Sequence, residues 1–119
     1  MPSHTFGTIK GEIKILTIDS ESIRGNMLGD PSTRQVAIYL PPNWNKDEKE
    51  YPLFVDLVGY TGSGLAHTNW KPFAESVPQR VERLVNEGKM GEVIIALPDC
   101  FTTLGGNQYI NSSAVGNWA

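Results

Sequence analysis

A glycine-rich loop follows an apolar segment and is the first place in the chain where chemistry could occur. Residues 52–58 are almost entirely apolar, and the sequence Gly-Tyr-Thr-Gly-Ser-Gly follows them from Gly59 to Gly64. Glycines let a backbone turn sharply while its N–H groups stay unobstructed. One N–H group aimed at a developing oxyanion contributes about 3 kcal/mol to a transition state. The loop is therefore interpreted either as part of an acyl-transfer site or as a flexible turn.

The glycine spacing argues against a dinucleotide site in this loop. The dinucleotide fingerprint is Gly-x-Gly-x-x-Gly leading directly into a helix, with an acidic residue near the end of the next strand. The spacing here is Gly-x-x-Gly-x-Gly, and Asp99, the nearest acid that ends a strand, lies far beyond Gly64. Backbone recognition of a pyrophosphate is therefore not expected.

Four further side chains have the residue types of a hydrolase triad: Ser63, His67, Asp56 and Asp99. A nucleophile elbow needs glycine two positions before and after the serine, whereas Thr and Leu occupy positions 61 and 65. We therefore interpret Ser63 and His67 as loop residues, and Asp99 as a turn residue that bonds its own backbone. Cys100 has no histidine placed to activate it and is interpreted as a small buried hydrophobe.

An uncharged stretch near the end of the chain combines small, amide and aromatic residues. Residues 104–112 read Leu-Gly-Gly-Asn-Gln-Tyr-Ile-Asn-Ser. Neutral hydrogen-bonding groups beside aromatic rings suit an uncharged polar ligand such as an ester. A packed loop whose amides bond the backbone fits the same composition.

Strands are expected to position these loops. Residues 11–18 and 34–40 alternate apolar and polar side chains, which predicts an antiparallel pair with one solvent-facing side. Residues 52–58 and 93–97 are nearly continuous apolar runs, which predicts parallel strands covered on both faces. The residues after 97 show no periodicity, so the sequence predicts a fold that stops before it is complete.

One helix is expected between the two apolar strands. Ser76 and Gln79 have the spacing of a capping box, and Gly88 follows the last apolar position as a stop signal. The helix therefore runs from Ser76 to Glu87. A strand, a helix and a second strand in this order predict a right-handed crossover unit.

These segments together resemble the N-terminal half of an α/β-hydrolase in the esterase D and S-formylglutathione hydrolase family. The resemblance rests on residues 52–64 and 93–118, and is loose before residue 50. It implies an α/β fold in which an antiparallel strand pair leads into parallel strands with a crossover helix. It also implies a carboxylic-ester hydrolase that uses a serine acyl-enzyme and no cofactor. The family's Gly-x-Ser-x-Gly elbow is absent from residues 1–119, so we expect a single incomplete domain without turnover of its own.

The resemblance further implies the residues of the site. Gly59 and the backbone N–H of Tyr60 match the oxyanion position, although Val58 stands where the family usually has histidine. The substrate-side candidates are polar or aromatic residues of the later loops: Asn107, Tyr109, Asn111, Trp70 and Trp118. No metal is expected, because the two histidines, His4 and His67, have no ligand spacing with each other or with the cysteine.

Composition limits the partners. The net charge is −3, and the ten basic residues are scattered among thirteen acidic ones, which argues against nucleic acid as a partner. The apolar runs are too short to cross a bilayer, and no signal-like segment occurs near the N-terminus. A lone cysteine favours a reducing cytoplasm. A small ester is the expected ligand.

A non-catalytic reading competes with the esterase reading. The chain could be a ligand-binding or partner-binding module, or a truncated relic, because it carries no nucleophile. A parallel strand at residues 53–58 normally has a neighbour on each side. We therefore also expect an unpaired apolar edge through which the chain forms homo-oligomers.

Overall fold

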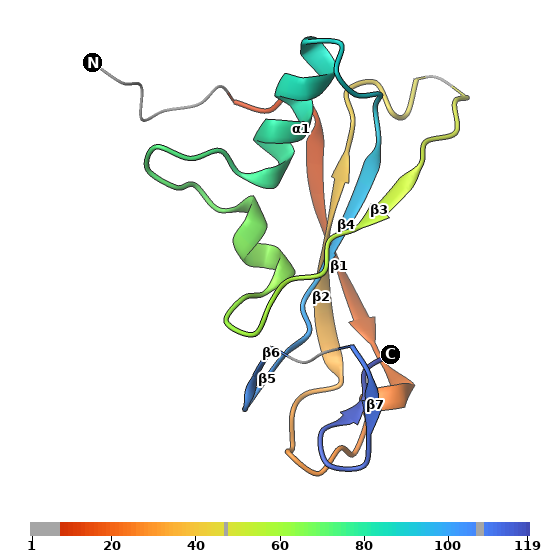
Figure 1. The fold of residues 1–119 in the computed structure, drawn as a ribbon. Coiled ribbons are helices and arrows are strands. Elements are labelled where there is room, and N and C mark those ends of the chain that lie inside the picture. Colours follow the sequence, from red (N-terminus) through yellow and green to blue (C-terminus); the bar gives the residue numbers. More distant parts are fainter. Residues whose placement is uncertain (1–7, 47, 107–108) are drawn as a thin grey trace.

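A four-stranded mixed sheet lies at the centre of the computed structural model, which describes residues 8–46, 48–106 and 109–119. The strands lie across the sheet in the order β1 (Glu12–Asp19), β2 (Thr33–Leu40), β4 (Ile94–Pro98) and β3 (Leu53–Val55) (Figure 1). β2 is antiparallel to both β1 and β4, whereas β3 and β4 are parallel. The predicted antiparallel pair and the predicted parallel pair are both confirmed.

The crossover helix α1 (Val77–Asn86) forms where the capping signals predicted it. The Gln79 N–H donates to Ser76 Oγ at 3.4 Å, and the Ser76 N–H donates to Gln79 Oε1 at 2.8 Å. At the other end, Gly88 adopts a φ of 71° and its N–H bonds the Val85 carbonyl. This left-handed residue ends the helix, as expected of glycine. No helix in the described part of the chain is long and apolar enough to cross a membrane.

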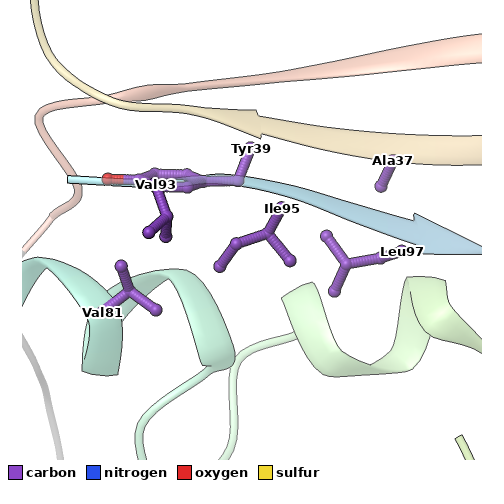
Figure 2. Packing of buried hydrophobic residues seen from close by; sticks show 6 residues of the cluster. All are labelled: Ala37, Tyr39, Val81, Val93, Ile95 and Leu97. Carbon is purple, nitrogen blue, oxygen red and sulfur yellow. The ribbon is translucent and has the colours of Figure 1, made fainter. Parts of the chain in front are cut away.

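The helix α1 and the short 3-10 helix η2 (Gly64–Thr68) lie on one face of the sheet (Figure 1), and the hydrophobic core lies between them and the sheet. Figure 2 shows Val81 of α1 facing side chains of β4 and β2, and the cluster comprises Ala37, Tyr39, Val81, Val93, Ile95 and Leu97. Glu82 of α1 connects the helix to the residues before β1 and to β2. Its carboxylate accepts the Lys10 N–H at 2.8 Å, the Gly11 N–H at 2.6 Å and the Tyr39 hydroxyl at 3.0 Å.

β3 is exposed on both faces of the sheet, so the prediction that the apolar strands are covered on both faces was wrong for this strand. Leu53, Phe54 and Val55 are 61%, 51% and 54% exposed. β4 pairs with one side of β3, and no other strand of the described residues pairs with it. β3 is also shorter than the predicted strand, because the pairing ends after the Asp56 N–H bonds the Ala96 carbonyl at 2.8 Å.

Short elements occupy the segments that showed no periodicity. The 3-10 helix η1 (Glu21–Ile23) lies in the loop between β1 and β2. After β4 the chain forms two small antiparallel hairpins, β5 (Phe101–Thr102) with β6 (Gly105–Gly106), and β7 (Asn111–Ser112) with β8 (Gly116–Asn117). Two-residue strands carry too few side chains to produce a two-residue period, which is why the sequence did not reveal them.

Candidate active-site pocket

A pocket of about 490 Å³ lies where the loop after β3 meets the segment after β4. Its lining combines glycine, hydroxyl, aromatic and aliphatic residues: Val58, Gly59, Tyr60, Thr102, Leu104, Gly106, Tyr109, Ile110, Ser112 and Val115. No residue in this list carries a formal charge at neutral pH. Such a lining suits an uncharged group, and the volume is in the ordinary range for a small-molecule ligand.

Two glycines let these segments approach each other closely. The Gly106 N–H donates to the Tyr60 carbonyl at 2.6 Å. A Cβ at position 106 would lie 2.5 Å from the Gly59 carbonyl oxygen, and a Cβ at position 105 would lie 2.6 Å from the Tyr60 ring. A larger residue at either position would push the loop away, so Gly105 and Gly106 bring the Gly59–Tyr60 turn into the pocket wall.

Tyr109 fixes the start of the same loop. Its hydroxyl accepts the Val58 N–H at 2.9 Å and donates to the Val58 carbonyl oxygen at 2.9 Å. Burial is the main cause that raises the pKa of Tyr109, so the phenol keeps the proton that it donates. The sequence indicated Tyr109 as a substrate-side residue, and the structure adds a backbone contact that holds the loop in place.

The carbonyls of Gly59 and Tyr60 are bonded, whereas their N–H groups are free within the described residues. The Gly59 carbonyl accepts the Gly62 N–H at 3.2 Å, and the Tyr60 carbonyl accepts the Gly106 N–H. Both residues line the pocket. A loop held by its carbonyls, with unused N–H groups, has the donors that a developing oxyanion requires.

Of the remaining predicted residues, those that the structure describes do not line the pocket. Asn107 lies outside the described residues. Asn111 is exposed, and its Oδ1 accepts the Ala119 N–H at 3.1 Å. Trp70 is largely exposed and Trp118 is buried, and neither belongs to the lining.

Arg34 explains the position of Trp118. The guanidinium of Arg34 lies 4.8 Å from the centre of the Trp118 ring, and the indole Nε1–H donates to the Val115 carbonyl at 3.0 Å. Arg34 also bonds the Phe101 carbonyl at 2.7 Å. Trp118 thus packs the end of the chain against β2 and the β5 region, in the manner of a core aromatic.

The triad candidates form two separate pairs. Ser63 Oγ donates to Asp99 Oδ1 at 3.1 Å, whereas His67 Nδ1 lies 2.5 Å from Asp56 Oδ2. The Phe101 N–H bonds Asp99 Oδ1 at 3.1 Å, which confirms Asp99 as a turn residue. Ser63 and His67 share no hydrogen bond in the described structure, so no triad is assembled from them.

Cys100 is less buried than the sequence interpretation expected. It is half-buried, and burial followed by the Asp99 carboxylate raises the pKa of its thiol. A protonated thiol is a poor nucleophile. Among the described residues no three His, Cys, Asp or Glu side chains come together as a metal site would require.

Sequence reasoning missed the apolar wall of the pocket. Leu104, Ile110 and Val115 line it, although the candidates chosen in this segment were the amides and aromatics. The sequence did contain a signal: each of these aliphatic residues is next to a glycine or a small polar residue in a segment without charge. That pattern could have indicated an apolar ligand group.

No family model and no curated protein matches this sequence. Solved structures do match it. A ferulic acid esterase aligns over 92% of this chain with a TM-score of 0.66 and 21% identity. A CE1 ferulic acid esterase from Anaeromyces mucronatus, solved in complex with ferulic acid and also without substrate, aligns over 92% of this chain with a TM-score of 0.56 and 22% identity.

These matches define the class of fold. The chain spans 39% of the first esterase and 35–36% of the second, so it corresponds to part of each. At this level of identity the likeness concerns the backbone. The chain has a partial esterase-like α/β fold, which confirms the predicted fold class in its general form.

Proposed function

We propose that this chain forms the oxyanion and acyl-binding part of a carboxylic-ester hydrolase of the serine type. The observation that carries the proposal is the N–H of Tyr60, which is free within the described residues and belongs to the wall of an uncharged pocket. Attack on an ester carbonyl moves negative charge onto its oxygen, and a fixed N–H group stabilises that charge. The neighbouring solved structures, which are ferulic acid esterases, support the same reaction class.

The pocket favours an aromatic acyl group. Tyr60 and Tyr109 offer ring surfaces, and Leu104, Ile110 and Val115 offer aliphatic contacts. An uncharged ester with an aromatic acyl group can enter without leaving a charged side chain desolvated, which would cost several kcal/mol. Ferulic acid, the ligand of one structural neighbour, is an aromatic acid of this kind.

The proposal takes the nucleophile from outside the residues described. The sequence has no Gly-x-Ser-x-Gly elbow, Ser63 bonds a carboxylate, and the raised pKa of Cys100 keeps its thiol protonated. We assign to this chain the binding and polarisation of the ester carbonyl. The attack itself would form a serine acyl-enzyme, which water then hydrolyses.

A binding experiment with methyl ferulate tests the proposal. The ester is titrated into the chain while backbone amide signals are followed by NMR. We expect saturable shifts at Gly59, Tyr60 and Gly106. Leu104→Ser should weaken binding severalfold, because the side chain lines the pocket and loses apolar contact.

Leu57→Ser is the matched control. Leu104 and Leu57 are 58% and 56% exposed, and Leu57 lies outside the pocket lining. Equal losses in the two variants, or no shift at Tyr60 in the parent chain, would reject the pocket as an ester site. Release of ferulate measured in the same samples reports turnover, which we expect to stay at the uncatalysed rate.

A non-catalytic ligand-binding module, or a relic of an esterase, is the second candidate. The pocket is formed within one chain that carries no nucleophile elbow, and this observation favours the second candidate. If ferulic acid bound as tightly as its methyl ester, the result would support a binding module. A site that stabilises the oxyanion of an ester should instead favour the ester over the free acid. If neither compound bound to the parent chain, the result would support a relic.

Three finer assignments complete the proposal. The resemblance of residues 52–64 and 93–118 supports membership of the esterase D and S-formylglutathione hydrolase family. The single cysteine supports a cytoplasmic location. The scattered charges support a small-molecule partner in preference to nucleic acid.

A further inference from the structure

A residue outside the pocket holds part of the pocket wall in place. Leu104 and Gly106 of the β5–β6 hairpin line the pocket, and the Gly106 N–H donates to the Tyr60 carbonyl at 2.6 Å. The same hairpin is bonded to Asp30, in the loop between β1 and β2. Asp30 Oδ1 accepts the Thr103 N–H at 2.9 Å and the Thr103 hydroxyl at 2.6 Å. Asp30 thus reaches Tyr60 through the hairpin, although neither Asp30 nor Thr103 belongs to the pocket lining.

The backbone of Asp30 is itself held by side-chain bonds. Its N–H donates to Asn26 Oδ1 at 3.1 Å, and Asn26 Nδ2 donates to the Asp30 carbonyl at 2.8 Å. The same Nδ2 donates at 2.8 Å to the carbonyl of Ile23, which is buried. The carboxylate that meets Thr103 therefore extends from a backbone that is anchored at a buried residue.

The hairpin can transmit the position of Thr103, because further bonds close its turn. Thr102 is buried, and its Oγ1 donates to the Gly105 carbonyl at 2.6 Å and accepts the Leu104 N–H at 3.2 Å. Thr102 and Gly105 are also opposed in the pairing of β5 with β6. A displacement of Thr103 would therefore move the end of the hairpin, and with it the Gly106 N–H.

We propose that Asp30 is a positioning residue for the Tyr60 N–H. Its carboxylate holds Thr103, the hairpin carries that position to Gly106, and Gly106 holds the Gly59–Tyr60 turn. The inference rests on the proposed function, in which the Tyr60 N–H polarises the ester carbonyl. A donor to an oxyanion has to be held within about 0.5 Å of its productive position, so Asp30 affects the site without contacting the substrate.

Asp30 uses one carboxylate oxygen for both bonds to Thr103. The other oxygen, Oδ2, is buried and has no hydrogen-bond partner among the described residues. An amide nitrogen in place of Oδ2 would therefore break no bond, whereas removal of the side chain would break both bonds to Thr103. Arg34 donates to the Phe101 carbonyl at 2.7 Å, so the start of the hairpin keeps its bond to β2 in either variant. Asp30→Asn and Asp30→Ala thus differ in the contact to Thr103.

The NMR scalar coupling across the hydrogen bond from the Gly106 nitrogen to the Tyr60 carbonyl carbon tests the proposal in the ligand-free chain. We expect Asp30→Ala to lower this coupling about twofold, because hydrogen bonds weaken steeply as their geometry departs from the ideal. Asp30→Asn should keep the parent value. Couplings within α1, recorded in the same spectra, show that each variant is folded. An unchanged coupling in Asp30→Ala, or an equal loss in Asp30→Asn, would overturn the proposal.

Asp19→Ala is the matched control. Asp19 lies at the start of the same loop, and its carboxylate accepts the Ser32 hydroxyl at 2.7 Å and Arg24 Nη2 at 2.5 Å. These bonds join residues of the loop to each other and do not reach the hairpin. The control should leave the coupling between Gly106 and Tyr60 unchanged. A loss as large as that of Asp30→Ala would show that Asp30 has no specific role.

Changes at Thr103 test the route from Asp30 to the hairpin. Thr103→Val removes the hydroxyl bond and keeps the N–H bond, so the coupling should fall less than in Asp30→Ala, and Thr103→Ser should behave as the parent. In the Asp30→Ala chain, Thr103→Val should have no further effect, because the acceptor is already absent. Additive losses would contradict transmission through Thr103.

Titration with methyl ferulate separates this inference from the proposed function. We expect Asp30→Ala to bind the ester about threefold more weakly, and Asp30→Asn and Asp19→Ala to bind it as the parent does. If the parent chain does not bind the ester, the proposed function fails, while a lowered coupling in Asp30→Ala still supports the role of Asp30 in holding Tyr60. If the coupling falls but the ester binds equally to the parent and to Asp30→Ala, Asp30 is not a positioning residue for the site.

Discussion

Replacing Tyr109 by phenylalanine should loosen the proposed oxyanion loop while keeping the aromatic ring. The change removes one hydroxyl, and with it the two 2.9 Å hydrogen bonds to the Val58 N–H and carbonyl. Val58 is buried, so water replaces these bonds incompletely. Each bond contributes about 1 kcal/mol, and the two together about 2 kcal/mol.

The free energy of unfolding, measured by urea denaturation, gives the overall loss. Amide hydrogen exchange at Val58 gives the local one, and should speed up more in the variant than exchange in α1. Tyr60→Phe is the matched control, because the Tyr60 side chain is 69% exposed and no hydrogen bond to its hydroxyl is formed in the described structure. We expect that control to stay within about 0.5 kcal/mol of the parent.

Two results would contradict this reasoning. If Tyr109→Phe were as stable as Tyr60→Phe, the hydroxyl would not hold the loop. If it were less stable but exchange at Val58 stayed unchanged, the loss would come from elsewhere in the segment. In either case the N–H of Tyr60 would lose its structural support as a fixed donor.

Three other changes test further parts of the structure. Gly106→Ala should lower the melting temperature and weaken methyl ferulate binding, because its Cβ would lie 2.5 Å from a backbone oxygen; Gly91→Ala, which meets nothing within 4 Å, should do neither. Glu82→Gln should cost about 2 kcal/mol in urea denaturation, since a charged acceptor of three donors is lost, whereas the exposed Glu50→Gln should be neutral. Burial and then Glu82 raise the pKa of Tyr39 above its ordinary 10.0. The free energy of unfolding should therefore be maintained below pH 10 and fall as the pH rises above it, because the Tyr39 phenol ionises first in the unfolded chain. The fall should be shallower in Tyr39→Phe.

Local signals predicted the parts of the fold that depend on neighbouring residues. The helix begins and ends where Ser76, Gln79 and Gly88 indicated, because capping is decided within one turn. The parallel pairing of β3 with β4 followed from the strand–helix–strand order. The exposure of β3 could not be predicted, since an apolar run has the same sequence whether or not other layers cover it.

The site was predictable only in its first half. The loop at Gly59 and Tyr60 could be identified from its glycines, but its partner segment could not, because the bond from Gly106 to Tyr60 joins residues far apart in the chain. The role of Trp118 also depends on a contact between residues far apart in the chain. Its ring suggested ligand binding, and the stacking with Arg34 that buries it depends on β2.

The attachment of Gly106 and Tyr109 to the loop after β3 also determines how the protein would lose its pocket. The core packs β2, β4 and α1, whereas the segment after β4 is held by two small hairpins and a few long-range bonds. Such a segment can detach in a partial unfolding step that leaves the sheet intact. The donor N–H groups would then lose their alignment before the protein denatured. A bound ligand would oppose that step, and protection of residues 101–118 from proteolysis would report pocket occupancy.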